Sequence, residues 1–111
     1  AFEMAHGSNV TLHIDSTKIK YHPAAYEMAS MGFIPDGAYK NRDYVGDHFK
    51  ASENVSRAML DILFDPQTSG GLLISVAESD ADRLLNDLLT HTNAAVIGFA
   101  AAHSDHDLIV S

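Results

Sequence analysis

The strongest constraint on the fold is that strand-like and helix-like apolar patterns alternate along the chain. Residues 9–15 alternate between apolar and polar side chains, which is typical of a half-buried strand. Within residues 53–64, apolar side chains recur three and four positions apart and form the stripe of an amphipathic helix. Further strands are predicted at residues 72–77, 94–102 and 107–110, and further helices at residues 2–6 and 23–31 and after Ser79. This order predicts an α+β fold in which helices cover a sheet of about four strands.

Capping signals predict where three of these helices begin or end. Gly7 is expected to stop the first helix, and Ser52 is expected to cap the helix over residues 53–64. Ser79, followed three residues later by Asp82, approximates a capping box for the next helix. The first helix is already in its last turn at the start of the chain, so we expect a longer parent protein.

Length and composition favour a single folded domain over residues 1–111. The chain is 46% hydrophobic and 20% charged, which is ordinary for a globular domain. No apolar run approaches the roughly 20 residues that cross a bilayer. Cysteine is absent, which excludes disulfides, thiolate catalysis and cysteine-ligated zinc within this chain. No signal peptide is visible. A domain without cysteine fits the cytoplasm, so a cytoplasmic location is expected.

The charge of the chain bears on its partners. A formal net charge of −8 makes nucleic acid a poor candidate, because a negative surface repels phosphate backbones. Basic and acidic side chains nearly balance between Lys40 and Arg57, whereas acids dominate from Glu78 to Ser111. An anionic ligand is therefore expected to approach the middle segment rather than the C-terminal third.

The densest group of polar and glycine residues is Asp65-Pro66-Gln67-Thr68-Ser69-Gly70-Gly71-Leu72-Leu73. Backbone N–H groups in such a glycine-rich turn can form an anion-binding concavity. An autonomous phosphate cradle is disfavoured, because the run follows the C-terminus of a helix, where the partial charge is negative, and it lacks a P-loop lysine. A tight helix-to-strand reversal and a loop that completes a site on another domain both stay open.

A second group is Gly32-Phe33-Ile34-Pro35-Asp36-Gly37 followed by Lys40-Asn41-Arg42. The Pro-Asp-Gly turn starts residues 33–50, which have no clear periodicity and are expected to form a long irregular loop. Two bases around an amide could place positive charge and a hydrogen-bond donor at the edge of a cleft.

The histidines predict no metal site. His103 and His106 lie in an expected solvated turn between two strands, although neighbouring acids give that turn some chelating character. The other histidines are scattered without a pairing pattern: His6, His13, His22, His48 and His91.

The Asp65–Leu73 run resembles the C-terminal domain of selenophosphate synthetase (selenide, water dikinase). Three further places agree with this family, in the same order along the chain. Gly32–Gly37, followed by Asn41 and Gly46, is similar to the family's Gly-x-x-Pro-x-Gly turn. Phe2-Glu3-Met4 followed by Gly7 is similar to the segment just after the family's Thr-Gly-Phe-Gly motif, and Ala95-Val96-Ile97-Gly98 is similar to its penultimate strand.

The resemblance implies a fold and a reaction. The fold is that of the second domain of the aminoimidazole ribonucleotide synthetase superfamily, a mixed sheet of about four strands with helices packed on its faces. Family members convert ATP, selenide and water to selenophosphate, AMP and phosphate, use magnesium, and form homodimers mainly through an N-terminal ATP-binding domain. The reactive cysteine or selenocysteine and the metal ligands belong to that N-terminal domain. The resemblance thus implies that this chain is an enzyme part, inactive and without bound ATP or magnesium when alone.

The role implied for this domain is to pack on the N-terminal domain and close its nucleotide cleft. The residues expected nearest the nucleotide are Asn41, Thr68, Ser69, Gly70 and Gly71, as hydrogen-bond donors and points of close backbone approach. No catalytic nucleophile and no metal ligand is expected here, and the surface that meets the other domain should be apolar and exposed. The alternatives are another ATP enzyme of the superfamily, in purine synthesis or hydrogenase maturation, and a non-catalytic acidic interaction module.

Overall fold

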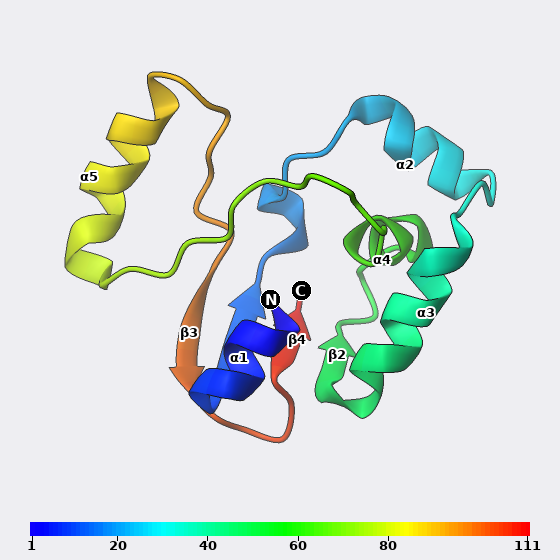
Figure 1. Cartoon of the computed structure of the whole chain (residues 1–111), viewed down its shortest axis with the longest axis horizontal. Helices are drawn as coiled ribbons and strands as arrows, with labels where there is room; N and C mark the ends of the chain where they lie inside the picture. The colour runs from blue at the N-terminus through cyan, green and yellow to red at the C-terminus, as the bar shows by residue number, and fades with distance from the viewer.

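A computed structural model describes residues 1–111 and contains five α-helices and a four-stranded sheet (Figure 1). The helices are α1 (Phe2–Ser8), α2 (Pro23–Ser30), α3 (Asp36–Val45), α4 (Arg57–Leu63) and α5 (Glu78–Leu89). The strands are β1 (Val10–Ile14), β2 (Phe49–Ala51), β3 (Gly98–Ala102) and β4 (Leu108–Val110). The predicted α+β class is confirmed.

The sheet is open and mixed, with the strand order β2-β4-β1-β3. Strand β1 pairs antiparallel with β3, whereas β4 pairs parallel with both β1 and β2. Leu108 of β4 lies between Leu12 of β1 and Phe49 of β2 in the register. The last strand of the chain therefore sits inside the sheet and joins its two halves.

Two small hydrophobic clusters form the core, and β4 contributes to both. Leu108 packs in the first cluster, and Val110 packs in the second. The other buried members of the first cluster are Ala5, Ala38, Val45 and Phe64, and those of the second are Val55 and Met59. Only 13 of 111 residues are buried, so a large apolar surface stays open to contact with something else.

Four of the helices lie toward the two edges of the sheet, which are formed by β2 and β3. Figure 1 shows α2, α3 and α4 grouped on the β2 side and α5 standing apart on the β3 side. Helix α1 contacts β1, and α2 contacts α4. None of these helices has both the length and the apolar character needed to cross a membrane.

The predicted irregular loop over residues 33–50 is wrong, because most of it forms α3 and β2. Asp36 places an acid in the first turn of α3, where the helix dipole favours it, and pairs with Lys40 at 2.7 Å. Only Ala38 and Val45 of this helix are buried. So few apolar contacts leave too weak a stripe for the sequence to reveal the helix.

The predicted strand over residues 72–77 is also wrong, because this segment pairs with no other strand. Its side chains are exposed, with Leu72 at 92%. The predicted strand over residues 94–102 shortens to β3, which begins at Gly98. A Cβ atom there would overlap the carbonyl oxygen of His13, so the close pairing with β1 needs glycine.

Three predicted helix ends are displaced. Helix α1 continues past Gly7 to Ser8 and is capped by Asn9, which adopts the left-handed conformation with φ 52° and ψ 49°. Ser56, not Ser52, caps α4, because its hydroxyl accepts a hydrogen bond from the N–H of Met59 at 3.2 Å. Helix α5 begins at Glu78, without a side-chain cap from Ser79.

The Ser56 cap predicts a difference between two serines four residues apart. Ser56→Ala should lower the free energy of unfolding by about 1 kcal/mol, because a helix N–H loses its partner. It should also lose the contact between the hydroxyls of Ser56 and Tyr26, which lie 3.0 Å apart. Ser52→Ala is the matched control, and urea denaturation should show it near neutral. The opposite ranking would mean that α4 begins at Ser52.

Candidate functional site

The two polar groups singled out in the sequence meet at the N-terminal end of α3. Pro66 packs against Gly37 so closely that a Cβ atom at residue 37 would lie 2.7 Å from Cγ of Pro66 and 2.9 Å from its Cβ. Only glycine permits this approach without displacing the proline. The contact seats the start of the Asp65–Leu73 run on the helix that carries Asn41.

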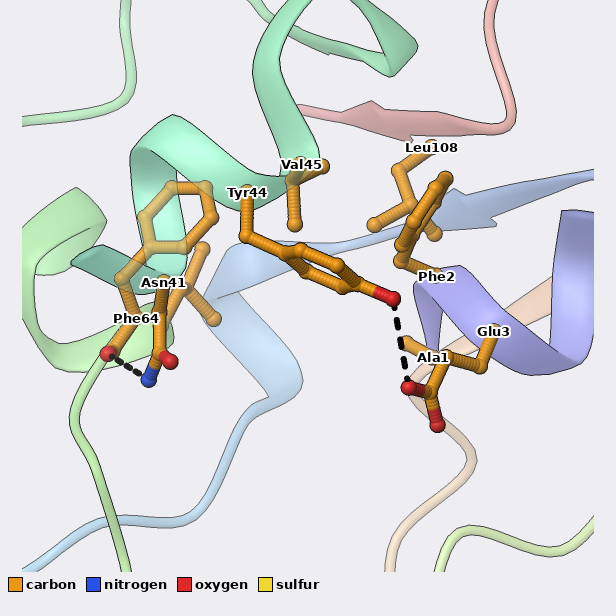
Figure 2. Close-up of a pocket in the computed structure, with 9 residues that line it drawn as sticks. Ala1, Phe2, Glu3, Asn41, Tyr44, Val45, Phe64 and Leu108 are labelled. Atoms are coloured by element: carbon orange, nitrogen blue, oxygen red, sulfur yellow. Dashed lines mark hydrogen bonds between the residues drawn. The ribbon is translucent and has the colours of Figure 1, made fainter.

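Asn41 adds a hydrogen bond to this junction between α3 and the residues that follow α4. Its amide Nδ2 donates a hydrogen bond to the carbonyl oxygen of Phe64 at 2.9 Å (Figure 2). Phe64 directly follows α4, and the last carbonyl groups of a helix lack partners within it. Asn41 therefore satisfies the end of α4 and fixes the point from which the polar run leaves the helix.

Two hollows adjoin this junction and share Asn41. The smaller, a pocket of about 250 Å³, lies among α1, α3 and the end of α4 (Figure 2). Tyr44 reaches across it, and its hydroxyl donates to Glu3 at 3.5 Å. The larger is a groove of about 1130 Å³ that runs between Asn41 and the segment around Tyr21. A groove of this volume is large enough for a nucleotide-sized ligand.

The structure brings together some of the predicted nucleotide-facing residues but not all of them. Asn41 and Gly70 line the groove. Thr68, Ser69 and Gly71 lie in the same exposed loop but are not among its lining residues. The sequence did not single out Lys20, which lines the groove, because a lone exposed lysine carries no pattern.

The basic side chains of the middle segment are mostly committed to carboxylates. Arg42 Nη2 donates to Oδ1 of the buried Asp61 at 2.8 Å, and Arg57 Nε donates to its Oδ2 at 3.2 Å. The Arg42 guanidinium also lies 5.1 Å from the ring centroid of Phe64. The Arg42 bond braces α3 against α4, whereas the Arg57 bond lies within α4. Lys20 is then a cation of the groove with no ion-pair partner.

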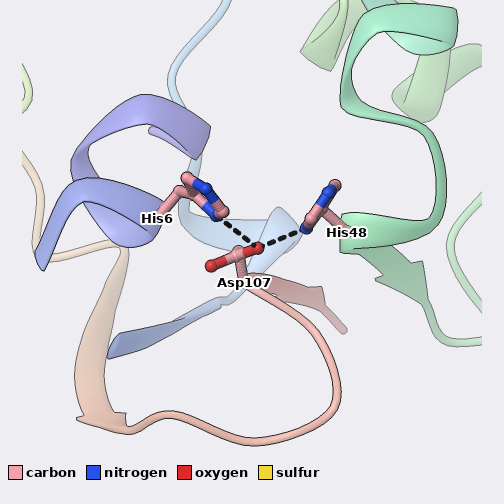
Figure 3. Close-up of side chains that lie close together, drawn as sticks. All are labelled: His6, His48 and Asp107. Atoms are coloured by element: carbon pink, nitrogen blue, oxygen red, sulfur yellow. Dashed lines mark hydrogen bonds and ion pairs between the residues drawn. The ribbon is translucent and has the colours of Figure 1, made fainter. Parts of the chain in front are cut away.

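A second polar cluster, which the sequence did not reveal, lies next to Phe2, which also lines the smaller pocket. Asp107 Oδ2 lies 2.6 Å from Nδ1 of His48 and 3.4 Å from Nδ1 of His6 (Figure 3). Burial opposes ionisation of Asp107, but the hydrogen bonds with His48 and His6 outweigh it and hold the pKa of this carboxyl below its usual 3.8. The three residues come from distant segments, so no local spacing could signal the cluster.

Comparison with known proteins shows what the chain is similar to. No protein-family model matches it. It is 40% identical over 111 residues to a selenide, water dikinase of Clostridium botulinum, covering 99% of this chain and 32% of that protein. It is 42% identical over 113 residues to selenide, water dikinase 2 of Peptoclostridium acidaminophilum, with the same shares. A third relative, from Clostridioides difficile, is 49% identical over 86 residues, covering 78% of this chain and 25% of that protein.

The chain matches a selenophosphate synthetase C-terminal domain. It spans about a third of the length of the curated relatives it matches. The names of those relatives describe a kinase-type enzyme that takes selenide and water. In this domain, the junction of Gly37, Asn41 and Pro66 is the feature whose geometry can be tested directly.

The Gly37–Pro66 contact predicts opposite effects for two glycine substitutions in helices. Alanine normally stabilises a helix interior by about 0.5–1 kcal/mol relative to glycine. Gly7→Ala in α1 should show this gain, because no atom lies within 4 Å of a Cβ there. Gly37→Ala should instead destabilise by about 1 kcal/mol, because it pushes Pro66 off α3. A gain in unfolding free energy for both variants would show that Pro66 does not rest on α3.

The ion pairs of Arg42 and Arg83 differ in exposure and predict a second contrast in stability. The Arg42 side chain is 27% exposed and that of Arg57 is 64% exposed, so Arg42 makes the better-shielded bond to Asp61. Arg42→Met should cost about 2 kcal/mol, the range for a hydrogen bond to a charged partner. Arg83→Met, which breaks an exposed pair with Asp80 at 3.0 Å, should cost less than about 0.5 kcal/mol. Thermal unfolding of the two variants checks this; equal losses would contradict the bracing role of Arg42.

Proposed function

We propose that this chain is the C-terminal domain of a selenophosphate synthetase and closes the nucleotide cleft of an N-terminal ATP-binding domain. The full enzyme converts ATP, selenide and water to selenophosphate, AMP and phosphate. The observation that carries the proposal is the groove beside Asn41 and Gly70, at the junction where the family's two motifs pack together. The similarity to selenide, water dikinases over essentially the whole chain supports the choice of reaction.

Backbone groups without hydrogen-bond partners support the proposal that another domain contacts this side of the chain. Residues 66–76 belong to no helix or strand and form no backbone–backbone hydrogen bond. The hydroxyls of Thr68 and Ser69 bond to no other protein group. Folded proteins satisfy most such groups, so this segment is suited to donate hydrogen bonds to something outside the chain. We propose that the acceptors are phosphoryl oxygens of the nucleotide and backbone carbonyl groups of the neighbouring domain.

Exposed apolar side chains indicate where the other domain rests. Large hydrophobic residues of the segment that follows the two glycines and of the β3 side are open to solvent: Leu72, Leu73, Ile74, Val76, Val96 and Phe99. Contiguous exposed apolar residues mark interaction surfaces rather than free surfaces of a soluble domain. This agrees with the expectation that the contact face should be apolar, and we propose the N-terminal domain as its cover.

The chemistry assigned to this domain is positioning and exclusion of water. Phosphoryl transfer depends mainly on electrostatic stabilisation and geometry, so hydrogen-bond donors contribute without a nucleophile. Lys20 adds a cation to the lining of the groove. The groove offers magnesium little, because Asp61 is bound by two arginines and Glu3 accepts from Tyr44, which leaves Asp65 as the one lining carboxylate without a side-chain partner. We therefore assign the magnesium ligands to the N-terminal domain.

The same proposal covers partners and location. The full enzyme is expected to be a cytoplasmic homodimer that associates through its N-terminal domains, with selenide as its substrate. This chain alone is expected to hold neither ATP nor magnesium, since the greater part of the site lies on the other domain.

The proposal predicts a loss of turnover without a loss of stability. In the intact enzyme, Thr68→Ala/Ser69→Ala should lower kcat/KM for ATP at least about tenfold, because donors to the phosphoryl groups disappear. Selenide-dependent AMP formation is the readout. The unfolding midpoint should not change, because both residues are exposed and their hydroxyls bond to no other protein group.

Ser79→Ala, at the exposed first turn of α5, serves as the control and should retain full activity. Unchanged turnover in the double variant, at unchanged stability, would remove the 65–71 loop from the nucleotide site. A loss of turnover in the control as large as that in the double variant would also contradict the assignment.

A further inference from the structure

The cluster of His6, His48 and Asp107 contains a buried carboxylate oxygen without a hydrogen-bond partner. Asp107 is 2% exposed, and its Oδ1 has no hydrogen-bond partner. A buried polar atom without a partner destabilises the folded state, and native structures avoid it unless something else occupies the site. Neither the Asn41 junction nor the proposed phosphoryl-transfer role uses this carboxylate.

Three imidazoles surround the carboxylate. Nδ1 of His6 and Nδ1 of His48 approach Oδ2 at 3.4 Å and 2.6 Å, and Nε2 of His103 lies 3.4 Å from Oδ1 (Figure 3 shows the first two). The ring of Phe2 packs against both His6 and His48, with centroid separations of 5.4 Å and 5.1 Å. This aromatic contact holds the two imidazoles so that both present a nitrogen to the same oxygen.

The spacing of these atoms fits a metal ion. One ligand atom from each of His6, His48 and Asp107 can be chosen so that all three lie within 4.8 Å of one another. A tetrahedral ion with bonds of about 2.0–2.1 Å keeps its ligand atoms about 3.4 Å apart. The His6–Asp107 separation already has this value, and the shorter His48–Asp107 hydrogen bond would have to open by about 0.8 Å.

We propose that His6, His48 and Asp107 bind a divalent transition-metal ion, with zinc as the best match to the ligand set. Imidazole nitrogens combined with a carboxylate suit zinc, copper and nickel, whereas magnesium and calcium take oxygen ligands. The side chains of His6 and His48 are 61% and 49% exposed, which gives an ion a route to the buried carboxylate. His103 adds a further imidazole beside the site, with its Nε2 3.4 Å from the other oxygen of Asp107.

The ion would join three segments that are distant along the chain. His6 lies on α1, His48 precedes β2, and Asp107 precedes the central strand β4. Asp107 is also fixed through its backbone, because its carbonyl oxygen accepts from the N–H of Leu12 at 2.8 Å. A ligand that binds only the folded chain stabilises it by mass action, so the site is structural in character.

The test is a zinc titration of the metal-free 111-residue chain by calorimetry, with circular dichroism to confirm that each variant is folded. The absence of cysteine removes thiolate sites that would compete for zinc. We expect one zinc ion per chain and a rise in melting temperature on binding. In His6→Gln/His48→Gln, zinc affinity should fall at least about a hundredfold, and the rise in melting temperature should disappear.

His22→Gln/His91→Gln is the matched control, because it also removes two exposed histidines but leaves the cluster intact. It should bind zinc as the parent chain does. Co²⁺ in place of zinc should give the visible absorption of a low-coordinate site in the parent and in this control, but not in His6→Gln/His48→Gln. Asp107→Asn should behave like the latter if it folds.

Two results would overturn the proposal. One is equal zinc affinity in the two double variants, which would place binding elsewhere on the surface. The other is a folded parent chain that binds no zinc, which would leave His6, His48 and Asp107 as a hydrogen-bonded network that shares protons and holds no metal.

Discussion

The short strand β4 is the element on which the rest of the structure depends. It pairs in parallel with β1 on one edge and β2 on the other, although these strands lie far from it along the chain. Its two buried side chains, Leu108 and Val110, enter the two separate core clusters. Without β4, no backbone hydrogen bonds would link β1 and β2 through the sheet. The same strand fixes Asp107, which precedes it, in a buried position.

One side of the domain is held together by many side-chain contacts, and the other side has few. On the β2 side, α3 and α4 are tied together by Asn41, by the bond of Arg42 to Asp61, and by the fit of Pro66 on Gly37. On the other side, residues 66–76 lack backbone partners, and α5 buries none of its residues. The boundary between the two halves runs through the polar loop. A loop in this position can respond to a neighbouring domain while the scaffold that carries it stays in place.

The sequence predicted the features that depend on local patterns. The α+β class, the alternation of β1 and the stripe of α4 follow from periodicity, and the family likeness followed from the Asp65–Leu73 run. The prediction failed where contacts between distant parts of the chain determine the local structure. Helix α3 is held by few apolar contacts. Residues 72–77 were predicted as a strand because they are mostly apolar, yet no other strand of the chain pairs with them.

The sites differ in the same way. Asn41 and Gly70 were predictable because they belong to motifs, and both line the groove. The cluster of His6, His48 and Asp107 was not, because only the insertion of β4 between β1 and β2 brings these segments together. Tertiary proximity of this kind leaves no trace in local spacing, so it required the fold.

The central claim is that the 65–71 loop faces the nucleotide in the intact enzyme. Amide hydrogen exchange of that enzyme, with and without ATP and magnesium, tests it most directly, because residues 66–76 have no backbone hydrogen bonds of their own. The account predicts that nucleotide slows exchange at residues 67–71 and leaves α5 unchanged. If nucleotide slows exchange elsewhere in the enzyme while residues 67–71 exchange as before, the loop does not close the cleft.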